Sequence, residues 1–173
     1  MRKSKEQEIL DAFLAQGEGV VPTARWHAEV NRANGNVERR ELGNVITADG
    51  LNAMAAQMLN GLATGVNSPF SYIAVGTVTD VGSLGSVLGG IGEVGRKVGS
   101  TITTSKNAAI MVTSWGGAAD SLTGVALGCA GIINHADSGS GTLGNHVTSL
   151  GITLADSDTL KLQCDVTVGS HNL

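Results

Sequence analysis

Apolar and polar side chains alternate along most of the chain after residue 70. The clearest case is the C-terminal segment, where Leu160, Leu162, Cys164, Val166 and Val168 alternate with Lys161, Gln163, Asp165 and Thr167. Because successive side chains of a β-strand point to opposite faces, this pattern predicts a strand with one core face and one face toward solvent or a partner. Further strands are predicted at residues 70–76, 96–105, 107–115, 122–134 and 142–154. Several short strands joined by regular turns favour a mainly β protein, an antiparallel β-sandwich.

Two further elements are predicted before these strands. Residues 25–46 predict a β-hairpin that turns at Asn34-Gly35, because both residues tolerate positive φ. Residues 49–60 predict a short helix, since their apolar residues recur at helical spacing on one face. That face is rich in methionine and could bind a partner, although packing on a core is the commoner use. We expect this helix to pack against the sandwich.

The N-terminal segment predicts a second short helix at residues 4–16, with an apolar stripe on one side. A helix of this length is not stable alone in water, so its stripe must dock on its own domain or on another subunit. A flexible connector is expected at residues 17–24. The predicted organisation is an N-terminal helical arm and connector over residues 1–24, followed by a β-sandwich domain over residues 25–173.

Composition and charge narrow the classes of function. The chain of 173 residues has 25 glycines, 15% charged residues and a net charge of −4. Phosphate binding needs a concentrated basic face, so nucleic acid is not expected as a partner. Charges are sparse after residue 45, which suggests that neighbouring subunits cover part of that surface. We find neither a signal peptide nor an apolar run long enough to span a membrane, so we expect a protein made in a cytoplasm without a membrane partner.

Candidate chemistry is sparse. Residues 90–95 match G-x-G-x-x-G, but they lie in a glycine-rich loop before a strand, whereas a dinucleotide site needs a strand before the motif and a helix after it. His135 and Asp137 lie in a Ser/Gly-rich turn, which favours a solvated loop over a metal site. No pattern indicates a nucleophile. We therefore assign no catalytic residue, no cofactor and no metal site, and do not expect an enzyme.

Other polar and sulfur-bearing residues have structural interpretations. Glu93 and Arg96 could form an exposed ion pair worth about 0–1 kcal/mol that fixes the preceding loop, or could contact a neighbouring subunit. Cys129 and Cys164 lie in apolar strand-like segments and are expected to be buried free thiols.

A small set of residues is suited to contact a partner. Trp26 could anchor an interface, where tryptophan is over-represented, or could pack in the core. Arg39 and Arg40 could bind a partner, or could lie solvated on a strand edge and discourage aggregation. The candidate partner-interface residues are Ile9, Leu10, Phe13, Leu14, Trp26, Arg39 and Arg40.

Taken in order, several segments resemble a family of small structural proteins of tailed-phage virions. These segments are Trp26-His27 with the Asn-Gly hairpin, residues 43–52, 71–77, 93–97, Trp115, and residues 131–134, 150–154 and 158–162. The resemblance covers about residues 25–169, and it rests on the order and spacing of the segments. Members of this family belong to the head, the tail or the tail-fibre region, and the resemblance carries over no catalytic residue.

The resemblance implies a non-enzymatic β-sandwich that assembles on a virion as a homo-oligomer, with the major capsid protein or other virion proteins as partners. The favoured role is a head decoration, or cement, protein that stabilises the head by binding neighbouring capsid subunits, which the N-terminal arm and the sparse charge suit. Another is a tail component, such as a baseplate or tail-fibre attachment protein. A third, an enzyme or carbohydrate-binding domain, is disfavoured because the chain has only 2 Trp, 2 Phe and 1 Tyr.

Overall fold

The computed structural model describes residues 19–43, 45–46, 50, 70–78, 91–105 and 108–171. Two of the predicted elements, the helices at residues 4–16 and 49–60, lie outside these residues apart from Gly50. The described part is mainly β, and its sheets are built from antiparallel strand pairs, as predicted.

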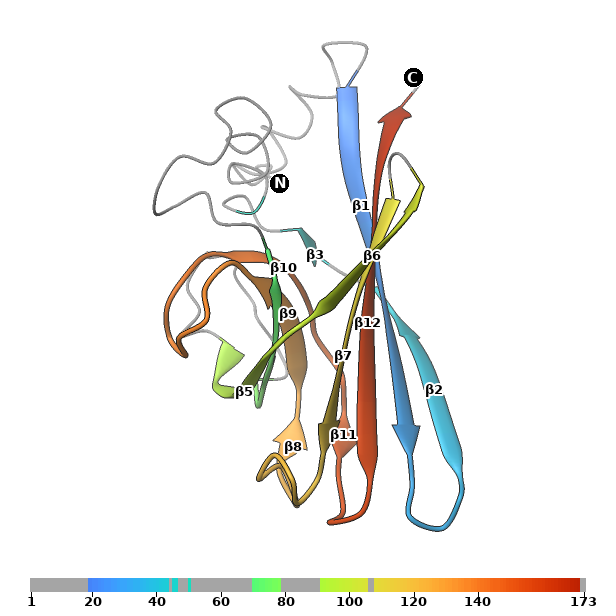
Figure 1. Ribbon diagram of the computed structural model, residues 1–173, viewed down its shortest axis with the longest axis vertical. Helices are drawn as coiled ribbons and strands as arrows, with labels where there is room; N and C mark the ends of the chain where they lie inside the picture. The colour runs from blue at the N-terminus through green and yellow to red at the C-terminus, as the bar shows by residue number, and fades with distance from the viewer. Residues whose placement is uncertain are drawn as a thin grey trace, which may run out of the picture.

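The first sheet has five strands in the order β2-β1-β12-β7-β6 (Figure 1). Its strands are β1 (Gly19–Asn31), β2 (Val37–Leu42), β6 (Ser100–Ser105), β7 (Ala108–Gly116) and β12 (Thr159–His171). The two longest strands, β1 and β12, pair along their whole lengths, from Gly19 opposite His171 to Asn31 opposite Thr159. This pairing joins the two ends of the described chain at the centre of the sheet.

The second sheet also has five strands, in the order β3-β10-β9-β4-β5, and lies beside the first in Figure 1. Its strands are β3 (Val45–Ile46), β4 (Tyr72–Gly76), β5 (Glu93–Val98), β9 (Cys129–Ile133) and β10 (Leu143–Val147). A separate two-stranded ribbon is formed by β8 (Ala126–Leu127) and β11 (Ile152–Thr153).

One hydrophobic core joins the two sheets. Its buried members include Trp26, Val30, Leu160 and Leu162 from the first sheet and Ile73, Val75, Ile132 and Val147 from the second. Burying one such aliphatic side chain fully stabilises the fold by about 1.5–3 kcal/mol. A smaller cluster, made of Ala74, Ile91, Cys129, Ile133 and Leu143, includes the alternate positions of β4 and β9 and so lies on the other face of the second sheet. Strands β4, β9 and β10 of the second sheet are therefore buried on both faces, whereas the first sheet keeps one open face.

The predicted alternation of the last strand is confirmed over residues 160–164. Leu160, Leu162 and Cys164 are buried, whereas Lys161 between them is exposed. The thiols of Cys129 and Cys164 are both buried and free, as predicted. Desolvation raises the pKa of Cys129 to about 11 and that of Cys164 to about 12, so both thiols stay protonated near neutral pH.

The predicted β1–β2 hairpin is present, but its turn differs from the expectation. Gly35 has a φ of 86°, whereas Asn34 does not adopt positive φ. The Asn34 side chain instead accepts a hydrogen bond from the Asn36 N–H at 3.0 Å, and the Gly35 N–H donates to the Arg32 carbonyl at 2.9 Å. Asn34 thus contributes to the turn through its side chain, and only Gly35 adopts the left-handed backbone conformation.

The prediction of a single strand at residues 96–105 is wrong, because the chain changes sheets at Gly99. Strand β5 ends at Val98 in the second sheet, and β6 begins at Ser100 in the first. The Gly99 N–H donates to the Ser71 carbonyl at 2.8 Å, and a Cβ at this position would collide with the side chain of Met111. A crossing this close to a buried side chain requires glycine.

The predicted strands at residues 122–134 and 142–154 are likewise each divided, the first into β8 and β9 and the second into β10 and β11. Two further strand boundaries differ from the prediction. Strand β5 begins at Glu93, inside the predicted loop, and β1 begins at Gly19, inside the predicted connector at residues 17–24. Among the described residues, β2 pairs only with residues 26–31 of β1, so no described strand pairs with that edge of β1 at Pro22, where a proline is tolerated.

Asp158 joins three segments at the hairpin end of the first sheet. Its Oδ1 accepts a hydrogen bond from the Ala33 N–H at 3.0 Å, and its Oδ2 accepts from the Ala155 N–H at 2.9 Å and from Arg32 Nη1 at 2.8 Å. The hydrogen bond from Ala155, together with those from Arg32 and Ala33, lowers the pKa of Asp158. The fold therefore stabilises the ionised carboxylate of Asp158 over its protonated form.

His146 on β10 is a buried polar residue that the fold favours in its uncharged form. Its side chain is almost fully buried, and its Nδ1 has no hydrogen-bond partner among the described residues. Desolvation lowers the pKa of this imidazole, so the fold favours its neutral form.

Candidate interaction surface

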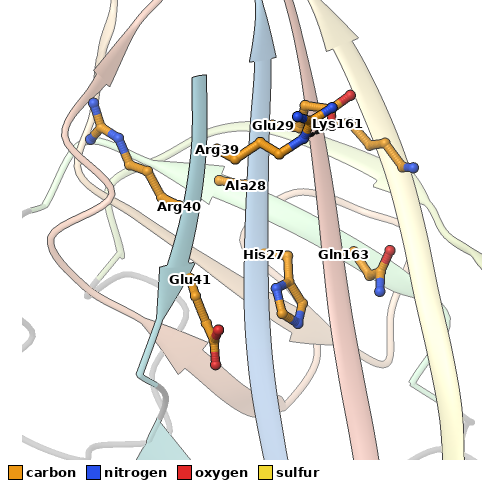
Figure 2. Close-up of a pocket in the computed structure, with 8 residues that line it drawn as sticks. All are labelled: His27, Ala28, Glu29, Arg39, Arg40, Glu41, Lys161 and Gln163. Atoms are coloured by element: carbon orange, nitrogen blue, oxygen red, sulfur yellow. Dashed lines mark hydrogen bonds and ion pairs between the residues drawn. The ribbon is translucent and has the colours of Figure 1, made fainter. Parts of the chain in front are cut away.

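The open face of the first sheet gathers charged and polar side chains over β2, β1 and β12. We call this surface the charged face, and it consists of Arg25, His27, Glu29, Arg39, Glu41, Lys161, Gln163 and Asp165. The strand register brings these residues together. Glu29 on β1 lies opposite Arg39 on β2 and Lys161 on β12. Two residues earlier on β1, His27 points to the same face and lies between Glu41 on β2 and Gln163 on β12 (Figure 2).

Ion pairs link β1 and β2 across the charged face. Arg39 Nε lies 2.7 Å from Glu29 Oε2, and Arg25 Nη1 lies 3.2 Å from Glu41 Oε1. The hydrogen bond from Arg39 lowers the pKa of Glu29, so this pair stays ionised at neutral pH. The side chains of Arg25 and Arg39 are 74% and 73% exposed, and exposed pairs contribute little to stability. Their main effect is to arrange opposite charges in fixed rows on an accessible surface.

A shallow open depression of about 290 Å³ lies within this surface. It is lined by Ala28 and Arg40 together with His27, Glu29, Arg39, Glu41, Lys161 and Gln163. Small-molecule sites are usually enclosed and mostly apolar, whereas the outer parts of protein interfaces are polar and open. The depression therefore suits contact with a polar protein surface better than capture of a small ligand.

The two predicted interface arginines have different surroundings. Arg39 belongs to the charged face, as described above. Arg40 points to the other side of β2 (Figure 2). Its Nη1 donates to the carbonyls of Leu150 at 2.7 Å and Gly151 at 3.1 Å. Arg40 thus ties the edge strand β2 to the loop after β10.

Trp26 is a core residue, which corrects its interpretation as an interface anchor. Its side chain is fully buried between the sheets, and its Nε1 donates to Asn145 Oδ1 on β10 at 3.1 Å. The hydrogen bond satisfies the indole N–H inside the core and links the two sheets. The remaining predicted interface residues, Ile9, Leu10, Phe13 and Leu14, lie outside the described part of the chain.

Glu93 and Arg96 form a buried ion pair, contrary to the exposed pair expected from the sequence. Their side chains are 6% and 4% exposed. Arg96 Nε and Nη2 donate to the two carboxylate oxygens of Glu93 at 2.8 and 2.7 Å. Arg96 Nη1 donates to the carbonyls of His135, Asp137 and Ser140 at 2.7, 2.6 and 3.0 Å. The pair is buried because the turn at residues 135–141 folds over it, and in return it fixes that turn.

The structure also places the His135–Asp137 pair and residues 91–95 of the G-x-G-x-x-G motif. The side chains of His135 and Asp137 are 44% and 81% exposed, and His135 Nδ1 lies 3.9 Å from Asp137 Oδ2. No group of three or more possible metal ligands occurs within the described ranges. Gly95 of the G-x-G-x-x-G motif lies within β5, so the described part of this motif leads into a strand and not into the helix that a dinucleotide site needs.

Most residues of the charged face were not singled out from the sequence. Alternation alone assigns Lys161, Gln163 and Asp165 to a polar face, and Arg39 is predicted as a partner contact. The missing information was the strand order, because residues 25–29 and 161–165 meet only when β1 pairs with β12.

No protein-family model matches the chain, and no curated protein or solved structure matches it. Within the part that the structure describes, no helix has the length and apolar character needed to cross a membrane.

Proposed function

We propose that the chain is a non-enzymatic structural protein of a tailed-phage virion, and that it is a capsid decoration protein. In this proposal it is a β-sandwich module that binds neighbouring subunits of the major capsid protein and thereby stabilises the head. The ordered segments that resemble small virion proteins support the assignment to a virion.

The observation that carries the proposed binding role is the charged face. Arg25, Arg39 and Lys161 alternate with Glu29, Glu41 and Asp165 over three neighbouring strands. Such a pattern is nearly neutral overall, so it attracts no ligand by net charge, but it fits only a surface with the complementary order of charges. Individually weak contacts of this kind become strong when many symmetric copies bind one lattice.

The strands beneath the charged face hold it in a fixed shape. β1 pairs with β12 over its full length, and Trp26 and Leu162 on the reverse side are fully buried in the core. A preorganised surface loses little conformational entropy when it binds, so more of the contact energy contributes to affinity.

The sharpest test exchanges one ion pair on the charged face. The double variant Glu29→Arg/Arg39→Glu keeps the net charge and the cross-strand pair, but it reverses the order of charges that a partner meets. We expect it to lose co-sedimentation with purified phage heads that lack the protein, while its thermal unfolding midpoint falls only slightly, because the new arginine at position 29 lies opposite the exposed Lys161. Asp156→Asn, on the exposed turn before β12, is the control and should bind like the wild type.

Two results would contradict this proposal. If the exchanged variant binds heads as tightly as the wild type, the charged face is not the contact surface. If mass spectrometry finds no copies of the protein in purified virions, the assignment to a virion is wrong. Copies found only with isolated tails would support the alternative of a tail component.

A further inference from the structure

The four edge strands of the two sheets differ sharply in charge. An edge strand presents unpaired N–H and C=O groups, and proteins discourage its pairing with other chains by charge or by short length. β2 carries Glu38, Arg39, Arg40 and Glu41, and β5 carries Glu93, Arg96 and Lys97. β3 has only two residues. β6, with the sequence Ser-Thr-Ile-Thr-Thr-Ser, has neither protection.

The side of the molecule that carries β6 is also open and partly apolar. Within the described residues, β7 is the only strand that pairs with β6, and Ser100 and Thr101 are exposed. β5 leads into β6 through Gly99 (Figure 1). Among the described residues, β5 carries two of the three exposed large apolar side chains, Val98 at 66% and Val94 at 39%. An uncharged edge thus continues from a strand with exposed valines that a partner would cover.

The residues of β6 favour pairing with another strand. Threonine and isoleucine have high β propensity, and a six-residue segment without charge or proline readily joins a neighbouring strand. Left open, such an edge promotes aggregation, so a soluble chain benefits from covering it.

We infer that β6 pairs antiparallel with β6 of a second copy, so that the two first sheets become one continuous sheet across a two-fold axis. Charge complementarity favours a copy of the same strand, because two uncharged edges meet without repulsion. The same pairing of β2 with β2 would bring four charged residues of one copy against the same four of the other. A two-fold pairing also closes on itself, so neither β6 edge remains free to extend a filament.

This dimer does not depend on the proposed function. β6 is separated from the charged face by β7, so dimerisation leaves β2, β1 and β12 accessible. A dimer could therefore form whether or not the chain binds a capsid, and the two proposals can fail separately.

Sedimentation velocity of the full chain over a dilution series tests the inference. The wild type should sediment as a dimer and dissociate on dilution. Ser100→Lys/Thr101→Lys places two charges on the otherwise uncharged edge of β6, which discourages strand pairing, and should weaken the dimer by about tenfold or more while the circular dichroism spectrum stays unchanged. Thr123→Lys/Ala126→Lys adds the same charge at exposed positions on and beside β8, and should leave the dimer intact.

Hydrogen exchange provides a second measurement that needs no variant. Backbone amides of Ser100–Ser105 should exchange more slowly in the concentrated wild type than in the dilute one. A wild type that sediments as a monomer at every concentration would overturn the inference, as would a dimer that the β6 lysines leave unchanged. If the lysine variant fails to fold, the exchange comparison decides: concentration-independent exchange in β6 contradicts the dimer.

Discussion

Replacing Arg96 with methionine tests whether its ion pair with Glu93 acts as a buried interaction. Methionine keeps much of the side-chain volume but removes the guanidinium. Glu93 then loses both hydrogen bonds from Arg96 and keeps the one from the Gly139 N–H at 3.2 Å. Its carboxylate, only 6% exposed, remains largely out of water without a counter-ion.

The burial of the pair determines the expected magnitude. Removing one partner of a buried pair costs about 3–5 kcal/mol, because the remaining charge stays desolvated. An exposed pair would cost about 0–1 kcal/mol. The three carbonyls that lose Arg96 belong to an exposed turn and can bind water instead, so they add little. Against a typical total stability of about 5–15 kcal/mol, the loss is large, but the chain should remain folded.

Urea denaturation of three variants measures this cost. We expect Arg96→Met to lower the free energy of unfolding by about 3–5 kcal/mol. Glu93→Met/Arg96→Met should recover part of this loss, because no unpaired charge remains, and Glu93→Met completes the double-mutant cycle. Amide exchange at Gly139 and Ser140 should accelerate in Arg96→Met. A loss below about 1 kcal/mol, with unchanged exchange in the turn, would refute the argument from burial.

Three further predictions concern the core and the response to acid. Leu162→Ala should lower the free energy of unfolding by about 2–5 kcal/mol in urea denaturation, because the residue is fully buried between the sheets. Trp26→Phe should cost about 1–3 kcal/mol by the same measurement, because it leaves Asn145 Oδ1 buried without its indole donor. Acid should destabilise the fold, since His146 and Asp158 both have lower pKa values in the fold than in the unfolded chain. The thermal unfolding midpoint should therefore fall as the pH drops below 6.5 for His146 and again below 3.8 for Asp158, and His146→Asn should flatten the first decrease.

The strands were predictable from sequence because their signal is local. Alternation along β12 and the Gly35 turn of the first hairpin depend on neighbouring residues, and both are confirmed. The Gly99 crossing was missed because both sides of it have strand character, and period-two alternation does not indicate which sheet a strand joins.

The arrangement of the candidate site depends on contacts between distant residues. Trp26 bonds Asn145 across 119 positions of the chain, and no local pattern indicates that the indole lies in the core. The burial of Arg96 likewise follows from a turn 39 to 44 positions away. Arg39 and Arg40 are adjacent in sequence, yet strand alternation places one on the charged face and the other against the Leu150 carbonyl.

Acetylation of Lys161, compared between free protein and protein bound to phage heads, tests most directly whether the charged face contacts the capsid. Lys161 is exposed in the free chain, and its position opposite Glu29 places it within the charged face. The proposal predicts that head binding protects Lys161 from the reagent. Equal modification in the free and the bound protein would contradict it.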